Sequence, residues 1–349
     1  MNNFHTLVVS EVKPETPNSV SITFKIPEEL KEKFRFKAGQ YLSIKHIANG
    51  KEVRRAYSIC SAPGSGIVKV GVKKVADGSF STYANTKLKA GDTLEVMPPQ
   101  GKFILDPKNE NIHNYAAFVA GSGITPVLSI VTNALEKEPD SNFLLVYGNR
   151  SMSETMFHTE LLELQQKYPD RFYLEFIYSR KQEEKAMFGR IERSTVNFFL
   201  KNKFKDNSFE AFYLCGPEMM IDEISATLKQ SGVNEKQIHH ELFSTAEKGL
   251  LLQKHDGETL LTVTVDDETA SFSMPQSKSV LEATLEEGMD PPYSCQGGIC
   301  STCIARIKEG KAEMKKNQIL TDGEIADGLI LTCQAHPTTP TLVIDYDDV

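Results

Sequence analysis

Four of the six cysteines in the chain have a spacing that suits metal binding. Cys295, Cys300 and Cys303 lie in the stretch YSCQGGICSTC, and Cys333 follows in LTCQAHP, which gives the pattern C-x4-C-x2-C-x29-C. A structural zinc site usually draws its thiolates from two C-x2-C pairs, whereas a plant-type [2Fe–2S] cluster uses a C-x4-C-x2-C run and a distant fourth cysteine. The spacing favours the iron–sulfur cluster, with structural zinc or reduced buried thiols as the alternatives.

The residues between these cysteines also fit a cluster. Gln296–Ile299 form the loop that must curl around the metal, and its two glycines allow backbone angles that other residues avoid. Backbone N–H groups of the loop, with the hydroxyls of Ser301 and Thr302, can donate hydrogen bonds to cluster sulfides and raise the reduction potential. No targeting segment or long apolar run is present, so we expect a cytoplasmic protein, where clustered cysteines bind metals more often than they form disulfides.

A glycine-rich stretch gives a second candidate site. AGSGITP (Ala120–Pro126) follows the apolar run YAAFV and precedes a helical pattern, which is the context of a nucleotide-binding loop. The pattern is G-x-G-x-x-P rather than G-x-G-x-x-G, and glycines at such a turn can also serve tight packing alone. The eight histidines are scattered without metal-ligand spacing, so we expect His239 and His240 to be surface or core residues.

The elements that position these residues fall into three regions. Residues 1–108 contain short alternating runs such as SVSITFKIP and QYLSIKHI between glycine and proline turns, which predict an antiparallel β-barrel. Residues 109–246 alternate strands with helices, which predicts a doubly wound parallel α/β sheet. Residues 247–261 are expected to be a linker, and residues 262–349 a small α+β domain.

Charge is distributed unevenly along the chain. The net charge is −8, and residues 262–349 alone hold fifteen Asp or Glu against six Lys or Arg. An acidic C-terminal domain disfavours nucleic-acid binding and is suited to docking on a basic protein partner, although simple solubility would explain it as well. The apolar runs are too short to span a membrane.

Together the motifs resemble a known family. Residues 262–349 resemble a plant-type ferredoxin domain with a β-grasp fold, on the cysteine spacing, the GG pair and LTCQAHP. RAYSICSAP (Arg55–Pro63) resembles the R-x-Y-S signature of the ferredoxin–NADP reductase superfamily, whose first domain is a flavin-binding β-barrel. AGSGITP and YLCGPEMM resemble the nicotinamide-nucleotide motifs of the same superfamily.

The resemblance implies a flavin site in the barrel. Arg55 would bind the pyrophosphate, Tyr57 would face the isoalloxazine ring, and Ser58 would place a hydroxyl near its N5. DGSFSTYA resembles the phosphate-binding turn, which implicates Gly78, Ser81 and Thr82. PPQGKF (Pro98–Phe103) resembles the members that bind FAD, so FAD is favoured over FMN.

The resemblance also implies a site for NADPH. Its residues are those of the glycine loop, of C-G-P-x-x-M, and of the Ser-Arg pair that holds a 2′-phosphate in NADP-dependent relatives: Gly121, Gly123, Thr125, Pro126, Cys215, Gly216, Pro217, Ser179 and Arg180. Read without the family, Cys215 fits a small buried side chain and Arg180 a solvated one. Glu241 and Phe243 of HHELF would lie near the flavin, where many plant-type reductases carry tyrosine in place of this phenylalanine.

The order of flavin barrel, NADP domain and ferredoxin domain resembles the reductase components of bacterial oxygenases. It implies an oxidoreductase that accepts hydride from NADPH on FAD and passes single electrons through the cluster to an oxygenase. Two kinds of oxygenase partner are implied: a di-iron enzyme acting on an aromatic CoA ester, and a Rieske-type hydroxylase. A diaphorase or oxidase that bypasses the cluster, and a non-catalytic electron carrier, are the alternatives from other classes.

Overall fold

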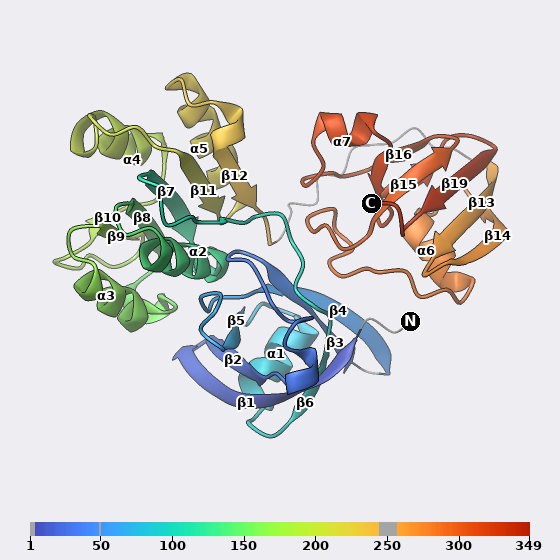
Figure 1. The fold of residues 1–349 in the computed structure, drawn as a ribbon, viewed down its shortest axis with the longest axis horizontal. Coiled ribbons are helices and arrows are strands. Elements are labelled where there is room, and N and C mark those ends of the chain that lie inside the picture. Colours follow the sequence, from blue (N-terminus) through green and yellow to red (C-terminus); the bar gives the residue numbers. More distant parts are fainter. Residues whose placement is uncertain (1–3, 49, 244–256) are drawn as a thin grey trace. The chain divides into compact units, whose positions relative to one another are not determined.

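The computed structural model describes residues 4–48, 50–243 and 257–349. The chain divides into compact units, one of which comprises His5–Val53 with Tyr57–Phe243, while the C-terminal domain makes up most of the other. Figure 1 shows the N-terminal barrel in blue to cyan, the parallel sheet in green to yellow and the C-terminal domain in orange to red. In the described residues no helix is long and apolar enough to cross a membrane.

The N-terminal domain is a six-stranded sheet of order β4-β3-β6-β1-β2-β5 whose registered pairs are antiparallel. Its elements are β1 (His5–Thr16), β2 (Ser19–Lys25), β3 (Tyr41–Ala48), β4 (Lys51–Ser58), β5 (Val68–Lys73), α1 (Ser79–Thr86) and β6 (Thr93–Val96). A bridge between Ile59 and Val70 joins the end of β4 to β5, which closes the sheet into a barrel. Alternating apolar side chains fill its interior, with Leu42, Ile44 and Val70 fully buried.

The second domain is a six-stranded sheet of order β10-β9-β8-β7-β11-β12 in which all pairs are parallel. Its strands are β7 (Asn114–Ala120), β8 (Asn142–Asn149), β9 (Phe172–Tyr178), β10 (Met187–Phe188), β11 (Ala211–Cys215) and β12 (Ile238–Glu241). The central strands are continuous apolar runs because helices cover both faces of the sheet.

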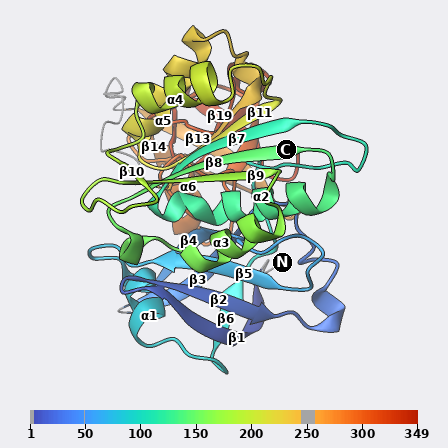
Figure 2. The same ribbon diagram turned by 90° about the vertical axis from the view of Figure 1, so that its left-hand side faces the viewer.

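Helices flank this sheet in two layers, as Figure 2 shows with α4 and α5 above the strands and α2 and α3 below. Their bounds are α2 (Ile124–Lys137), α3 (His158–Lys167), α4 (Arg193–Phe198) and α5 (Glu218–Gln230). Proline is tolerated in the first turn of α2 because no intrahelical bond needs its missing N–H. The parallel order and the two helical layers confirm the predicted doubly wound domain.

The C-terminal domain contains a five-stranded sheet of order β14-β13-β19-β15-β17 and a small β16–β18 ribbon. The elements are β13 (Glu258–Val265), β14 (Glu268–Pro275), α6 (Val280–Glu286), β15 (Ile304–Glu309), β16 (Ala312–Met314), α7 (Asp322–Ala326), β17 (Leu329–Leu331), β18 (Ala335–Pro337) and β19 (Thr341–Asp345). Asp266 and Asp267 both have positive φ, at the turn that joins β13 to β14.

The predicted linker, residues 247–261, lies largely outside the described residues. The part that is described already belongs to the last domain, because β13 starts at Glu258, four residues before the predicted domain start at Thr262. Strand pairing explains the earlier start, since Leu260 and Leu261 are in register with β19.

Candidate functional site

The four cysteine thiols of the C-terminal domain lie in two contacting pairs. The thiol of Cys295 contacts that of Cys300, and the thiol of Cys303 contacts that of Cys333. Cys295 is half-buried and the other three are buried. Among the described residues, no three His, Cys, Asp or Glu side chains are grouped as they would be around one metal ion. Two pairs of thiolates fit a cluster in which each of two irons takes two protein ligands.

The backbone between the first two cysteines is tightly constrained. Gln296 and Gly298 have φ values of 53° and 71°. A Cβ on Gly298 would lie 2.7 Å from the carbonyl oxygen of Lys316, so only glycine fits this position. The Gly297 N–H lies 3.3 Å from the Sγ of Cys295, so the loop already directs a backbone donor at a ligand sulfur.

A buried hydroxyl at the edge of this loop gives a further test of the cluster assignment. Ser294 is 1% exposed, and its Oγ has no hydrogen-bond partner in the described part of the chain. Buried polar atoms are rarely left without a partner. Cluster sulfides would accept a hydrogen bond at this place, so the residues present fit a [2Fe–2S] cluster.

Side chains from three separate motifs meet at a buried position in the other compact unit. The Ser58 hydroxyl, at the end of β4, lies 3.2 Å from the Glu241 carboxylate at the end of β12. Cys215 ends β11 and is in register with Glu241. Burial, with the charge of Glu241 as a second cause, raises the pKa of the Cys215 thiol well above its usual value. The thiol is therefore neutral at physiological pH.

The predicted flavin turn is held together by its own side chains. Tyr57 of β4 packs on Phe80 in the first turn of α1, with ring centroids 5.3 Å apart. The buried Ser81 hydroxyl accepts a hydrogen bond from the Val75 N–H and donates to the Gly78 carbonyl, both at 3.3 Å. A Cβ on Gly78 would lie 2.3 Å from that hydroxyl. Ser81 thus shapes the turn at the start of α1.

The remaining predicted flavin residues lie on the same two elements. Arg55 is exposed on β4, and its guanidinium donates to the Arg54 carbonyl at 2.7 Å. Thr82 is half-buried in the first turn of α1, where its N–H donates to the Gly78 carbonyl at 3.0 Å. A guanidinium on a strand and a helix start are both suited to a pyrophosphate.

The two nicotinamide motifs lie against each other at the carboxyl ends of β7 and β11. A Cβ on Gly123 would lie 2.2 Å from the Cys215 carbonyl oxygen, so the glycine loop passes directly over the end of β11. Gly121 has a φ of 58°, which favours glycine. A Cβ on Gly216 would lie 2.6 Å from the Met220 side chain. The two motifs, about ninety residues apart in the sequence, therefore lie side by side in the fold.

Two helix starts carry the remaining residues of the predicted nucleotide site. Thr125 is buried, and its hydroxyl donates to the Ser122 carbonyl at 3.0 Å. Pro126 is buried in the first turn of α2, and Pro217 caps the start of α5. Parallel sheets bind nucleotides at the carboxyl ends of their strands, where these helices begin.

A basic edge lies at the ends of β8 and β9. The Ser179 N–H donates to the Asn149 carbonyl and the Arg180 N–H to the Arg150 carbonyl, each at 3.0 Å. Both arginines are exposed, and the Nδ2 of Asn149 is buried without a hydrogen-bond partner among the described residues. Sequence reasoning missed Arg150 and Asn149, whose only signal is their position directly after a predicted strand.

A lysine from the barrel reaches the glycine loop. The Nζ of Lys73, at the end of β5, lies 3.7 Å from the position of a Cβ on Gly121. Burial lowers the pKa of Lys73; the charge of Glu154 opposes this shift and that of Arg150 adds to it. None of the motifs identified in the sequence includes this residue.

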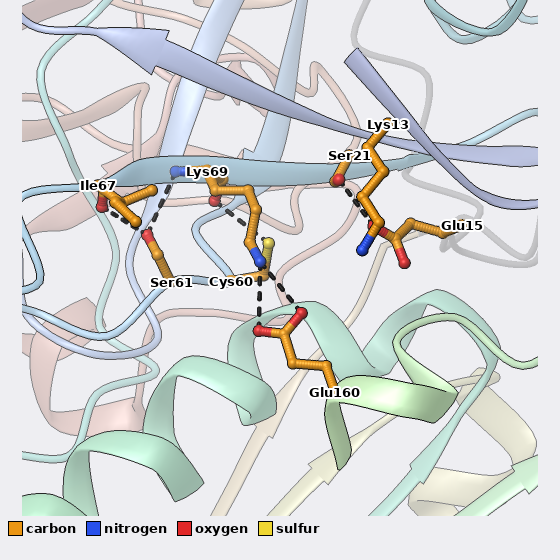
Figure 3. A network of polar contacts seen from close by, with 8 residues as sticks. All are labelled: Lys13, Glu15, Ser21, Cys60, Ser61, Ile67, Lys69 and Glu160. Carbon is orange, nitrogen blue, oxygen red and sulfur yellow. Dashed lines mark hydrogen bonds and ion pairs between the residues drawn. The ribbon is translucent and has the colours of Figure 1, made fainter. Parts of the chain in front are cut away.

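A polar network joins the barrel to the parallel-sheet domain (Figure 3). The Lys69 ammonium on β5 donates to both carboxylate oxygens of Glu160 on α3, at 3.1 and 3.2 Å. The buried Cys60 thiol donates to the Lys69 carbonyl at 3.3 Å. Nearby, the Ser129 hydroxyl of α2 donates to the Ser61 carbonyl at 2.6 Å. These contacts hold the barrel and the nucleotide domain against each other within one compact unit.

The last predicted residues lie at the end of the parallel sheet. Phe243 is 41% exposed, so part of its ring is available to a ligand. His239 stacks on Tyr213 with ring centroids 5.1 Å apart, which gives this histidine a packing role. His240 is exposed next to it.

Family profiles match the chain in the order that the fold displays. The oxidoreductase FAD-binding domain matches residues 6–104, the oxidoreductase NAD-binding domain residues 118–226, and the 2Fe-2S iron-sulfur cluster binding domain residues 263–338.

Curated relatives match over nearly the full length. A component of the 1,2-phenylacetyl-CoA epoxidase of Escherichia coli (strain K12) is 38% identical, with 99% of each chain covered. The ferredoxin reductase component of 3-ketosteroid-9-alpha-monooxygenase from Rhodococcus rhodochrous is 34% identical, with 97% of this chain and 96% of the relative covered. The chain belongs to the family of oxygenase reductases.

Solved structures show the same fold. Phthalate dioxygenase reductase superposes with a TM-score of 0.60 at 22% identity, covering 98% of each chain. An intact type IV self-sufficient cytochrome P450 monooxygenase gives a TM-score of 0.70 at 21% identity over 98% of this chain, which spans 41% of that longer protein.

The predicted cofactors and reaction class are confirmed at the level of the family. This reductase is an NAD(P)H-dependent oxidoreductase that binds FAD, a nicotinamide nucleotide and a [2Fe–2S] cluster. It belongs with proteins that donate electrons to oxygenase partners. The zinc and FMN alternatives are therefore set aside.

Proposed function

We propose that this reductase takes hydride from NADPH at the Ser58–Cys215–Glu241 site and supplies single electrons to a phenylacetyl-CoA epoxidase. The observation that carries the hydride site is the buried 3.2 Å contact between Ser58 and Glu241, with Cys215 in register beside them. Bound FAD accepts a hydride and releases its electrons one at a time to the cluster. The 38% identity to the epoxidase component over 99% of the chain supports the pathway.

Each residue of the hydride site has a distinct role in this proposal. Glu241 accepts a hydrogen bond from the Ser58 hydroxyl and so holds it in one orientation, in which it would lie near N5 of a bound flavin. The neutral Cys215 thiol forms one wall of the nicotinamide pocket without adding a charge next to the transferred hydride. With FAD bound, Tyr57 would supply an aromatic face to the flavin ring, Arg55 would bind its pyrophosphate, and Phe243, 41% exposed, would cover the nicotinamide-facing side.

The preference for NADPH rests on the basic edge of the parallel sheet. Arg150 and Arg180 follow the ends of the neighbouring strands β8 and β9, and both are exposed. In this proposal their guanidinium groups would bind a 2′-phosphate together with Ser179. Guanidinium groups suit a phosphate dianion, whereas NADH-specific sites use an acidic residue on the ribose. Lys73 would contact the pyrophosphate over the glycine loop, and Phe188, 62% exposed on β10, offers a face for adenine.

The acidic C-terminal domain is the proposed docking surface for the oxygenase. Asp266, Asp267 and Asp347 lie where β13 and β19 end, and the Asp347 carboxylate accepts hydrogen bonds from the N–H groups of Asp266 and Asp267 at 3.0 and 2.8 Å. If the contact is electrostatic, added salt weakens electron delivery to the oxygenase and leaves NADPH oxidation by ferricyanide unchanged.

Reconstitution tests the pathway. The purified holoprotein is combined with the oxygenase component of either the phenylacetyl-CoA epoxidase or the 3-ketosteroid-9-alpha-monooxygenase, and product is measured per NADPH oxidised. Coupled turnover with the epoxidase alone supports the proposal. Coupling to the ketosteroid oxygenase alone would favour the second candidate, which the 34% identity of that reductase supports. Equal kcat/KM with NADPH and NADH would contradict the proposed coenzyme.

A further inference from the structure

Ser294 is an anomaly in the C-terminal domain. It lies between buried Tyr293 and the cluster ligand Cys295 and is itself only 1% exposed. Its Oγ is the only buried side-chain oxygen or nitrogen without a hydrogen-bond partner in the described residues 257–349. A buried hydroxyl without a partner destabilises the folded state, and alanine at the same place would avoid that cost.

The other hydroxyls around this loop show how the domain normally satisfies such groups. Thr332 precedes Cys333, is fully buried, donates to the Cys303 carbonyl at 3.0 Å and accepts from the Tyr346 hydroxyl at 2.8 Å. Thr302, next to Cys303, contacts the Cys300 thiol. Ser294 also directly precedes a ligand, but its hydroxyl has no such contact in the described residues.

We propose that the Ser294 hydroxyl donates a hydrogen bond to a sulfur of the [2Fe–2S] cluster and thereby raises its reduction potential. The sulfides and thiolates of a bound cluster are the acceptors that this enclosed position would gain, since the described protein residues offer none to the hydroxyl. A donor stabilises the reduced cluster, which carries one more negative charge, more than the oxidised one. Ser294 is then a tuning residue rather than a ligand.

The test is an anaerobic redox titration of the holoprotein with Ser294→Ala, followed by the EPR signal of the reduced cluster. The variant should lower the midpoint potential, by up to the roughly 59 mV that a tenfold change in a one-electron equilibrium represents. Resonance Raman spectra should show Fe–S bands that shift in deuterated water in the wild type and shift less in the variant. NADPH oxidation by ferricyanide should stay unchanged, because that reaction does not use the cluster.

Ser271→Ala is the matched control. Ser271 lies on the edge strand β14, and its hydroxyl pairs with that of Thr262 at 2.8 Å, so its loss should leave the cluster potential unchanged. Ser294→Gly is a second variant, which also lacks the hydroxyl and introduces no added bulk. An unchanged potential in both Ser294 variants at full iron content would overturn the proposal. So would an equal shift in Ser271→Ala, or loss of iron from both Ser294 variants, which would indicate a role in assembly.

Discussion

The hydride site and the cysteine loop of this reductase are built in different ways. Ser58 and Glu241 are 183 residues apart and meet only because the barrel packs against the parallel sheet. Three of the four cluster cysteines lie within the nine residues 295–303, and their spacing, with Cys333 further on, favours a [2Fe–2S] cluster. One site therefore depends on domain packing, and the other mainly on a local loop.

The two sites differ also in how their polar groups are satisfied. Ser58 already has its acidic partner, and the Ser81 hydroxyl of the flavin turn is bonded within the protein. Ser294 beside the cluster has none among the described residues. We infer that the protein alone holds the Ser58 and Ser81 hydroxyls in place, whereas the Ser294 hydroxyl gains its partner when the cluster binds.

The largest expected effect is that of a cluster-ligand variant, which should abolish electron transfer through the cluster and leave the hydride site active. Cys300→Ser removes a cluster ligand, so reduction of the oxygenase and of cytochrome c, both one-electron acceptors, should fall to background. Ferricyanide reduction by NADPH should persist because the hydride site lies in the other compact unit. Undiminished oxygenase turnover would show that electrons bypass the cluster, as in a diaphorase. Iron content and the visible spectrum are the controls.

The hydride site should respond to loss of its internal contact. Ser58→Ala and Glu241→Gln each should lower kcat for ferricyanide reduction by about 10- to 100-fold, the equivalent of losing a hydrogen bond to a charged group. Because the two side chains bond each other, the double variant should lose less than the product of the single losses. Cluster content should be unchanged in all three. Fully independent effects would contradict the proposed pairing.

Arg180→Ala tests the proposed preference of the nucleotide domain for NADPH over NADH. The variant should lower kcat/KM for NADPH by about tenfold to a hundredfold and leave that for NADH nearly unchanged, because only NADPH carries the 2′-phosphate. Lys181→Ala is the matched control: this neighbouring cation is exposed and pairs with Glu183 at 3.1 Å. Equal losses for both coenzymes would place Arg180 outside the phosphate site.

The contact between barrel and nucleotide domain should have a smaller effect. Side chains of Lys69 and Glu160 are 19% and 39% exposed, so solvent screens their ion pair. A double-mutant cycle with Lys69→Met and Glu160→Gln should give a coupling free energy of unfolding of up to about 1 kcal/mol in urea titrations. High salt should reduce it. A much larger coupling would indicate that this pair dominates domain packing.

The Cys215 thiol should contribute no pH dependence near neutrality. Burial and the charge of Glu241 raise its pKa, which keeps the thiol protonated. The pH profile of kcat should therefore have the same shape in wild type and Cys215→Ala, even if the values differ. A limb that disappears in the variant would show that the thiol ionises during turnover.

Local patterns in the sequence predicted the elements and motifs well. The cysteine spacing, the alternating strands of the barrel and the strand–helix alternation each depend on neighbouring residues. The glycine loop and Cys215 were predicted separately, but their contact through Gly123 needed the structure, because it depends on which strands are neighbours in the sheet.

Other features depend on three-dimensional environment and left no local signal. Lys73 reaches the glycine loop only because β5 of the barrel ends there. Asn149 stands out only through its buried Nδ2, which has no hydrogen-bond partner within the distance and angle limits among the described residues. Ser294 likewise lies within the cysteine motif, but the spacing of the cysteines says nothing about its hydroxyl. Ser81 was expected to offer its hydroxyl to the flavin, yet in the structure the hydroxyl bonds the turn itself.

Hydride should enter at the flavin and electrons should leave through the cluster, and an anaerobic NADPH titration tests this route most directly. The wild-type holoprotein should oxidise about one and a half NADPH per chain, because FAD accepts two electrons and the cluster accepts one. Cys300→Ser should take up about one. Equal uptake by the two proteins, with the wild-type cluster still oxidised at the endpoint, would contradict the proposed route.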